Sequence, residues 1–309
     1  MKKYFSFSLI VLPVFSLLCS GCKKSDSPES TLHIIVLGDW GREGTQFQIP
    51  VRDQMINDAR KNPLNFIIST GDNFYEDGVS SVTDSQWRTS YENIYSDSSL
   101  QVPWVVSLGN HDYQNTAEPD AEIAYTSHSK RWIMPARYYQ KDFSAAGDNT
   151  LSVFIFDTTP FLVKYHVKDS TYHVNSQNTE QQLVWLDSAL GACTSKWKFV
   201  AGHHPIYSSS KDGGTVELVA RMLPILQKHH VQAYICGHNH NLQHIQRDGM
   251  DFYVSGAGSQ AKDARDSSQT ALYSEQQAGF LDLMVTADQT TATFINAWGQ
   301  TANVSVMKP

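Results

Sequence analysis

Five short polar clusters contain the residue types that perform metal chemistry. Each follows a run of apolar residues and combines a glycine with Asp, Asn, Tyr or His. In chain order they are Gly38-Asp39-Trp40-Gly41, Gly71-Asp72-Asn73-Phe74-Tyr75, Gly109-Asn110-His111-Asp112, Gly202-His203-His204-Pro205 and Gly237-His238-Asn239-His240. Taken singly, such an Asp is often a helix N-cap and such a His a packed side chain. Together the clusters form a donor set for metal ions.

The donor types indicate which metals would bind. Carboxylate, phenolate, amide and imidazole groups are hard to borderline donors, so they favour Fe, Mn or Zn over metals that prefer thiolates. There are enough donors for two ions, one carboxylate bridging them. A two-metal site holds its ions about 3.5–4 Å apart and clamps the attacking and leaving oxygens of a phosphoryl displacement. The clusters therefore predict two-metal phosphoester chemistry.

The apolar runs before these clusters predict strands that are buried on both faces, because they are short and rich in Val, Ile and Phe. They cover residues 33–37, 65–69, 102–108, 197–201 and 231–236, and a sixth run covers 151–156. Helical patterns cover 51–61, 179–190 and 215–228, the last with a kink expected at Pro224. Alternating strands and helices indicate an α/β fold, in which ligands bind beyond the carboxyl ends of the strands.

The C-terminal part predicts strands with little helix between them, at 252–255, 281–286, 291–298 and 303–307. We expect these strands to complete a second sheet packed against the first, which gives a two-sheet β-sandwich flanked by helices. Residues 113–150 and 261–278 are polar or irregular, and we expect loops there around the mouth of the site.

At these residues the chain resembles the calcineurin-like metallophosphoesterase superfamily, whose motifs GD-x-x, GDN, GNH[DE], GH-x-P and GHxH all occur here in that order. Two positions make it similar to the purple acid phosphatases of the tartrate-resistant type. General members carry Asp-x-His at the first motif, where this chain has Gly41 instead of the His. Tyr75 lies three residues after the expected bridging Asp72, as the purple-phosphatase signature requires. The resemblance covers nearly all of residues 32–309.

The resemblance implies one ligand set for each of two metals. An Fe(III) ion would take Asp39, Asp72, Tyr75 and His240. A second, divalent ion (Fe, Zn or Mn) would take Asp72, Asn110, His203 and His238. Asp72 would bridge the two, and the ions would attract a phosphate dianion because local metal charge outweighs the net charge of the protein.

The implied activity is that of an acid phosphatase, which hydrolyses phosphate monoesters with a metal-bound hydroxide as nucleophile. We expect Asn110 and His111 to contact the substrate and His111 to protonate the leaving alkoxide; the alternative is that His111 only stabilises phosphoryl charge. Asp112 either orients His111 or caps a helix. His204 is expected to take part in catalysis and line the substrate pocket, or else to face outward. Asp212 stands where mammalian-type members have a further substrate-contacting His, which leaves substrate range and pH optimum open.

Two other functions remain open at this stage. The same superfamily includes phosphodiesterases and nucleotide phosphatases, which would keep the fold and change the substrate. A surface binding lipoprotein that uses the metals structurally or to capture phosphate is a non-catalytic alternative, although His111 and the two separate ligand sets argue against it.

Residues 1–21 predict a signal peptide. Lys2 and Lys3 precede an apolar stretch at 5–18, which is too short to cross a bilayer as a mature helix. The small residues before Cys22 resemble a bacterial lipoprotein processing site, so Cys22 is expected to carry lipid; a plain signal peptide is the alternative. Residues 22–31 read as a polar tether and 32–309 as one catalytic domain. We therefore expect an exported protein, anchored on the periplasmic or cell-surface side of a bacterial envelope.

Composition excludes several classes. In the 309 residues, 41% hydrophobic and 11% aromatic content excludes disorder for most of the chain. Loss of Lys2 and Lys3 with the signal segment lowers the formal charge from −7 to −9. Without a basic run, nucleic acid is a poor partner. Cys193 and Cys236 either pair, as exported cysteines often do, or remain buried thiols. Oligomeric state is not predicted.

Overall fold

The computed structural model describes the chain except for residues 5–30, 115–118, 146–147, 212 and 267–269. Cys22, most of the signal segment, nearly all of the tether and Asp212 therefore lie outside the described residues. Within the part that is described, no helix combines the length and apolar character needed to cross a membrane.

Two seven-stranded sheets form the centre of the fold. The first has the order β14-β13-β12-β1-β2-β3-β4 and the second the order β11-β9-β10-β8-β7-β6-β5. The first sheet comprises β1 (Leu32–Leu37), β2 (Phe66–Ser69), β3 (Trp104–Val106), β4 (Trp132–Ile133), β12 (Gly279–Val285), β13 (Thr290–Asn296) and β14 (Thr301–Met307). The second comprises β5 (Tyr139–Ala145), β6 (Asp148–Ile155), β7 (Trp197–Ala201), β8 (Ala233–Cys236), β9 (Leu242–Arg247), β10 (Met250–Ser255) and β11 (Tyr273–Glu275).

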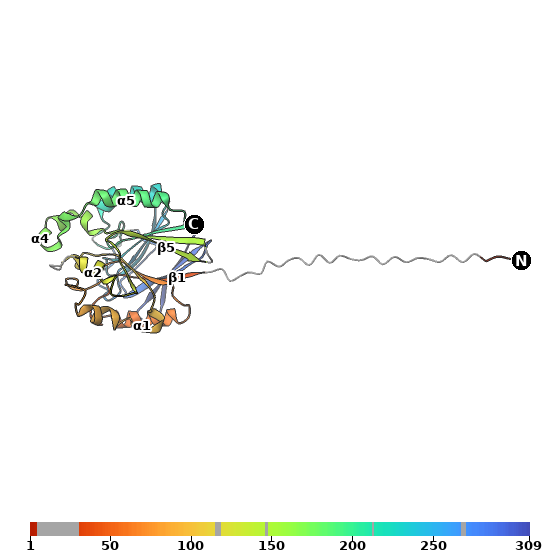
Figure 1. The fold of residues 1–309 in the computed structure, drawn as a ribbon, viewed down its shortest axis with the longest axis horizontal. Helices are drawn as coiled ribbons and strands as arrows, with labels where there is room; N and C mark the ends of the chain where they lie inside the picture. The colour runs from red at the N-terminus through yellow and green to blue at the C-terminus, as the bar shows by residue number, and fades with distance from the viewer. Residues whose placement is uncertain (5–30, 115–118, 146–147, 212, 267–269) are drawn as a thin grey trace.

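Helices cover the outer faces of this pair of sheets. In Figure 1, α1 (Gln48–Ala59) lies along one outer face and α5 (Thr179–Ala192) along the opposite one. The remaining α-helices are α2 (Asp120–Tyr125), α3 (Val163–His166), α4 (Asp169–Tyr172), α6 (Val216–Arg221) and α7 (Leu223–Lys228). Single turns of 3-10 or π-helix are η1 (Trp87–Glu92), η2 (Ser98–Leu100), η3 (His111–Tyr113), η4 (Thr159–Phe161) and η5 (Val174–Ser176). The expected two-sheet α/β architecture is confirmed.

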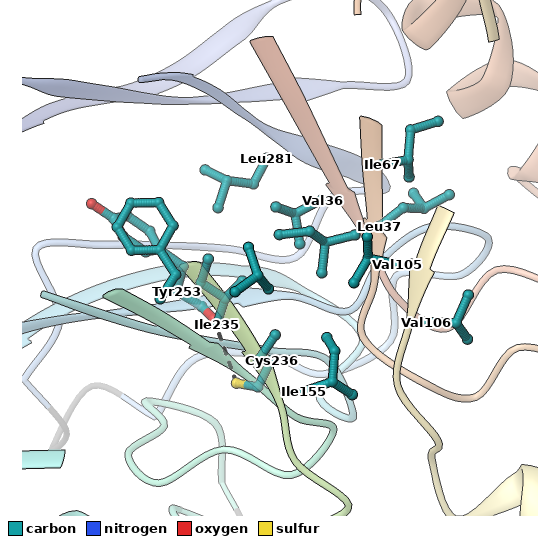
Figure 2. Close-up of a cluster of buried hydrophobic side chains, with 14 of the residues drawn as sticks. Val36, Leu37, Ile67, Val105, Val106, Ile155, Ile235, Cys236, Tyr253 and Leu281 are labelled. Atoms are coloured by element: carbon teal, nitrogen blue, oxygen red, sulfur yellow. Dashed lines mark hydrogen bonds between the residues drawn. The ribbon is translucent and has the colours of Figure 1, made fainter. Parts of the chain in front are cut away.

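The core lies between the sheets. Figure 2 shows Val36 and Leu281 of the first sheet near Ile235 and Tyr253 of the second. All four side chains are fully buried. Because β1 to β4 run parallel, as do β6, β7, β8 and β10, the strand ends of each set lie at one edge. This arrangement is what positions the five polar clusters.

The expected assignment of the C-terminal strands is wrong in part. Only β10 joins the second sheet, beside β8, whereas β12, β13 and β14 extend the first sheet. β12 pairs antiparallel with β1, placing Leu283 opposite Ile34. The reason is that β1 pairs with β2 along one edge, which leaves its other edge free for β12. A strand of alternating pattern can pair equally well at the edge of either sheet. Local sequence does not distinguish these two edges.

The two expected loop regions contain regular structure. Residues 113–150 include α2, β4, β5 and the start of β6, and 261–278 include β11. β5 is an edge strand in which most side chains are exposed, so it lacks the apolar run that would predict a strand. The helix expected at 215–228 is divided at Met222, between α6 and α7, and not kinked at Pro224. Pro224 instead occupies the first turn of α7, where its missing N–H costs no hydrogen bond.

Cys193 and Cys236 are both free thiols, so the disulfide alternative is wrong. Cys236 is buried in the core, where its thiol donates to the Tyr253 carbonyl at 3.5 Å (Figure 2). Cys193 is half-buried.

A buried ion triad joins β1, α1 and β12 away from the polar clusters. The Nε2 atom of His33 lies 2.7 Å from Asp282 Oδ1 and 3.2 Å from Asp58 Oδ2. The carbonyl of Asn62 accepts from Nδ1 at 2.8 Å. Burial alone would lower the pKa of His33, but the two carboxylates outweigh it and raise that pKa to about 10. The charged imidazole therefore contributes stability that is complete below about pH 6.5 and lost as pH rises toward 10.

We predict that His33→Gln lowers the free energy of unfolding at pH 6 by about 3 kcal/mol, because it leaves two carboxylates buried without a cation. Urea unfolding from pH 6 to 10 should show wild-type stability falling toward that of the variant. His128→Gln, at an exposed histidine, is the control and should behave as wild type. Equal pH slopes for wild type and His33→Gln would contradict this role.

Candidate metal centre

The five clusters occupy the carboxyl ends of five parallel strands. Asp39, Asp72 and Asn110 follow β1, β2 and β3 of the first sheet, and His203 and His238 follow β7 and β8 of the second. Backbone hydrogen bonds join these ends: the Asp39 N–H donates to the Gly71 carbonyl at 3.0 Å, and the Gly237 N–H to the His203 carbonyl at 3.0 Å. Segments far apart in the chain thus meet at one edge.

One group of donors centres on Tyr75. Its hydroxyl lies 3.0 Å from Asp39 Oδ1, 3.0 Å from Asp72 Oδ2 and 3.2 Å from His240 Nε2. His240 Nε2 is in turn 3.2 Å from Asp39 Oδ1. All four residues are almost completely buried. We call Asp39, Asp72, Tyr75 and His240 the tyrosine group.

A second group shares Asp72 with the first. His203 Nε2 lies 3.3 Å from Asp72 Oδ2 and 3.2 Å from His238 Nδ1. Asn110 precedes His111 in the chain. The backbone N–H of His111 donates to Asp72 Oδ1 at 2.8 Å, which holds this segment beside Asp72. Among the described residues, Asn110 Oδ1 is buried without a hydrogen-bond partner. We call Asp72, Asn110, His203 and His238 the histidine group.

Hydrogen bonds on the far side of the rings orient these imidazoles. His203 Nδ1 lies 2.9 Å from the Thr70 carbonyl, so this nitrogen carries a proton and Nε2 is the atom left to bind a metal ion once it is deprotonated. His240 Nδ1 lies 3.1 Å from Gln260 Oε1, with the same consequence for its Nε2. Ring nitrogens and carboxylate oxygens therefore lie close together in both groups. This is the donor arrangement that suits metal cations.

Three of these residues have strained backbones. Asp39, Asp72 and His238 have φ angles of 59°, 50° and 66°, a region that non-glycine residues rarely adopt. Each such conformation costs of order 1 kcal/mol or more. The strain turns the three side chains toward the shared space, and the surrounding hydrogen bonds maintain it: the His238 N–H, for example, donates to Asp39 Oδ2 at 2.9 Å.

The electrostatics of the site favour a bound cation. Burial and the charges of Asp39 and Asp72 raise the pKa of Tyr75 well above its ordinary value, so the phenolate needs a strong positive charge beside it. Burial would raise the pKa of Asp72, but His203 and His111 hold it well below the usual range. The pKa of His203 would fall through burial, yet Asp72 raises it to about 9. A proton on His203 therefore competes with a metal ion.

Comparison with known proteins agrees with this geometry. Residues 32–242 match the calcineurin-like phosphoesterase family. Purple acid phosphatase 4 of Arabidopsis thaliana is 38% identical over 244 residues, covering 76% of this chain and 70% of that protein. Tartrate-resistant acid phosphatase type 5 of Oryctolagus cuniculus is 33% identical, covering 87% and 89%.

The chain belongs to the purple acid phosphatase family. It is a binuclear-metal phosphatase, a phosphoester hydrolase, as the five motifs predicted. The solved structure of GAP50, the anchor in the inner membrane complex of Plasmodium, has a TM-score of 0.78 at 24% identity, covering 90% of this chain and 89% of that one. This last likeness shows the shared fold alone.

The first motif of this purple acid phosphatase has no room for the histidine of general superfamily members. A Cβ atom on Gly41 would lie 1.8 Å from the Asn73 carbonyl oxygen. The Gly41 carbonyl also accepts from the Tyr75 N–H at 2.9 Å. The close approach of the first two motifs thus brings Tyr75 to the position from which its hydroxyl reaches Asp39.

His111 is half-buried at the rim of the site. Its Nδ1 lies 2.5 Å from the Glu76 carbonyl and its Nε2 is 4.0 Å from Asp72 Oδ2. The ring is 4.5 Å from that of Tyr75. The Glu76 carbonyl thus fixes the ring, and Nε2 is left on the side of the donor groups.

His204 is fully buried beside the histidine group. Its Nδ1 lies 2.8 Å from Thr158 Oγ1, its Nε2 lies 2.8 Å from the Tyr165 hydroxyl, and its ring is 4.3 Å from that of His238. Burial keeps the pKa of His204 well below the ordinary value. Both ring nitrogens of His204 thus lie at hydrogen-bond distance from protein hydroxyl groups, those of Thr158 and Tyr165.

Asp112 neither bonds to His111 nor caps a helix, so both expected roles are wrong. Its Oδ1 accepts from the Asn73 N–H at 2.8 Å and the Phe74 N–H at 3.2 Å, and its Oδ2 accepts from the Gly109 N–H at 2.8 Å. Asp112 therefore joins the second motif, at Asn73 and Phe74, to the third motif, at Gly109. Burial, together with the charge of Asp72, raises the pKa of Asp112 to about 7.

Glu122 was missed by sequence reasoning. It is fully buried in α2, and its Oε2 accepts from the Asn73 side-chain amide at 2.9 Å. Burial and the neighbouring Asp112 raise its pKa well above the ordinary value. Because it lies in a polar stretch with no motif, no local signal pointed to it.

We predict that Gly41→Ala lowers the free energy of unfolding by at least about 3 kcal/mol and reduces metal content, because the new methyl group would displace Asn73 and its neighbour Asp72. Urea unfolding and elemental analysis measure both effects. Gly191→Ala, within α5 on the surface, is the control and should change stability by no more than about 1 kcal/mol. Wild-type stability and metal content in Gly41→Ala would refute this packing argument.

Proposed function

We propose that this chain hydrolyses phosphate monoesters at a centre of one Fe(III) and one divalent ion. The observation that carries the proposal is the position of the Tyr75 hydroxyl, 3.0 Å from both Asp39 and Asp72. Two carboxylates and a phenol are the hard, anionic donors that Fe(III) prefers. The tyrosine group would hold the ferric ion.

The histidine group would hold the divalent ion, which we expect to be Fe, Zn or Mn. Asn110, His203 and His238 are neutral donors, and Asp72 supplies the one carboxylate that both groups share. This smaller negative charge leaves the second ion electrophilic toward a substrate oxygen. When bound, the two ions supply Lewis-acid charge and an activated water for in-line displacement.

The chain's own residues bind and orient the substrate. Asn110 and His111 would contact the phosphoryl group, and His111 Nε2 would give its proton to the leaving alkoxide. The Glu76 carbonyl holds the Nδ1 side of that ring, which supports delivery of the proton from Nε2. For His204 we propose that it takes part in catalysis and lines the substrate pocket, where its ring lies 4.3 Å from that of His238 while Thr158 and Tyr165 hold its two nitrogens. Asp212 remains a proposed substrate contact.

We predict that the purified chain binds iron together with a second metal and absorbs visible light through charge transfer from Tyr75 to Fe(III). Tyr75→Phe should lose that band while keeping the divalent metal, because only the phenolate is removed. Elemental analysis and an absorption spectrum of the same sample check this. Tyr138→Phe is a control at a tyrosine that packs against Trp185, and it should keep the band.

Turnover assays on the same sample complete the test. An aryl phosphate monoester should be cleaved faster than the matching diester, and Asp72→Ala should abolish cleavage of both. A fully metallated, colourless protein would contradict the ferric assignment. Preference for the diester would favour the phosphodiesterase alternative, and full turnover by Asp72→Ala would overturn the catalytic role of the centre.

We also propose export and lipid anchoring at Cys22, supported by the charged and apolar composition of residues 1–21. In a bacterial host that processes lipoproteins, Cys22→Ser should move the chain from the membrane fraction to the detergent-free soluble fraction and abolish labelling by a fatty acid. Cys193→Ser, in the folded part, is the control and should stay with the membrane. Unchanged labelling of Cys22→Ser would rule out this anchor.

A further inference from the structure

One arginine faces the ring of Tyr75. The guanidinium carbon of Arg42 lies 3.6 Å from the centre of that ring, which is the shortest of the arginine–ring and lysine–ring contacts in the described part of the chain. A cation within about 6 Å of an aromatic ring centre is attracted by the negative face of the ring. Arg42 therefore contacts a proposed ligand of the ferric ion on its ring, away from the hydroxyl that faces Asp39 and Asp72.

The first motif holds Arg42 in this place. Arg42 follows Gly41, whose carbonyl accepts from the Tyr75 N–H at 2.9 Å. The Arg42 N–H donates to Oε1 of the buried Gln48 at 3.0 Å, and the Arg42 carbonyl accepts from the Thr45 N–H at 2.9 Å. Because its backbone is fixed on both sides, the side chain of Arg42 starts from a defined position beside Tyr75.

The guanidinium of Arg42 is buried with few hydrogen-bond partners. Its side chain is 9% exposed, and no described residue accepts a hydrogen bond from the buried Nε atom. Its Nη1 atom lies 2.7 Å from Glu76 Oε1, but the Glu76 side chain is 68% exposed, so water screens that carboxylate. A buried charge is costly unless neighbouring groups compensate it, and here the ring face of Tyr75 supplies part of that compensation. Packing against the ring would not by itself require a charged residue.

The charges around Tyr75 are divided between the two ends of its side chain. The carboxylates of Asp39 and Asp72 lie at the hydroxyl, whereas the positive charge of Arg42 lies over the ring. A metal ion bound at the hydroxyl draws electron density from the ring, and a cation over the ring opposes that donation. Groups that contact a ligand in this way tune the metal without binding it.

We propose that Arg42 is a positioning residue that acts through Tyr75: it holds the ring and, by its charge, weakens electron donation from the phenolate to the ferric ion. The inference rests on the proposed function, because it requires a ferric ion in the tyrosine group. An ion that receives less electron density has a higher reduction potential and is a stronger Lewis acid toward its oxygen ligands. Arg42 thus sets the electronic state of one half of the centre from outside both ligand sets.

The charge-transfer band of the metal-loaded full chain measures this effect, because the transition moves an electron from the Tyr75 ring to the ion. Arg42→Met keeps an extended side chain over the ring and removes the charge. It should shift the band to longer wavelength, since the electron no longer leaves the vicinity of a cation, and it should lower the reduction potential of the ferric ion in a redox titration. Arg42→Lys keeps the charge and should restore most of both values. Packing alone would make Met at least as effective as Lys.

Glu76→Gln tests the same charge without altering the arginine. It keeps an oxygen that accepts from Arg42 and removes the opposing carboxylate, so the band should shift to shorter wavelength. Arg247→Met is the matched control, because Arg247 lies 4.3 Å from the ring centre of Tyr207, which is not one of the donor residues. This control should change neither the band nor the reduction potential.

The outcomes separate this inference from the proposed function. An unshifted band in Arg42→Met, or equal shifts in Arg42→Met and Arg42→Lys, would overturn the role of the Arg42 charge and leave the phosphatase function intact. A wild-type chain that binds iron without a visible band would overturn the ferric assignment and this inference with it. If Arg42→Met does not yield folded, iron-containing protein, Glu76→Gln decides: a shift to shorter wavelength supports the role, and an unchanged band overturns it.

Discussion

Two buried carboxylates facing one phenol are the constraint on which the rest of this structure depends. The Tyr75 hydroxyl lies 3.0 Å from a carboxylate oxygen of Asp39 and 3.0 Å from one of Asp72, and all three side chains are buried. Buried charges of the same sign are costly unless a cation compensates them. The site is therefore complete only with positive charge inside it, which ties folding of this edge to metal binding.

The surrounding protein holds that arrangement from behind. Trp40 and Phe74, each next to a donor residue in the chain, pack edge to face at 5.5 Å within a buried aromatic cluster that also contains Trp104 and Trp132. Trp40 Nε1 donates to Ser69 Oγ at 2.8 Å, which fixes the end of β2 against the end of β1. Asp112 then joins the second and third motifs through three backbone N–H groups. Apolar packing and backbone hydrogen bonds together maintain the strained φ angles of Asp39 and Asp72.

The two halves of the centre differ in charge because they come from different strand ends. The tyrosine group combines the ends of β1 and β2 with His240 and carries the anionic donors. The histidine group takes Asn110 from the first sheet and two imidazoles from the second, with only Asp72 in common. This asymmetry is the basis of our proposal of unlike ions in the two positions. A side pocket partly lined by His238 adjoins the less anionic half.

The sequence by itself determined the donor residues, their order, the α/β class and the choice of Tyr75 over a histidine at position 41, because each of these depends on residues close together in the chain. Only the tertiary structure decided that β12 joins β1, that Glu122 lies behind Asn73, that His204 is enclosed by Thr158 and Tyr165, and that Lys164 and His238 line one pocket. These contacts join segments tens or hundreds of residues apart. They depend on which sheet edge is free and on how the packed elements are oriented, and no local periodicity or motif encodes either.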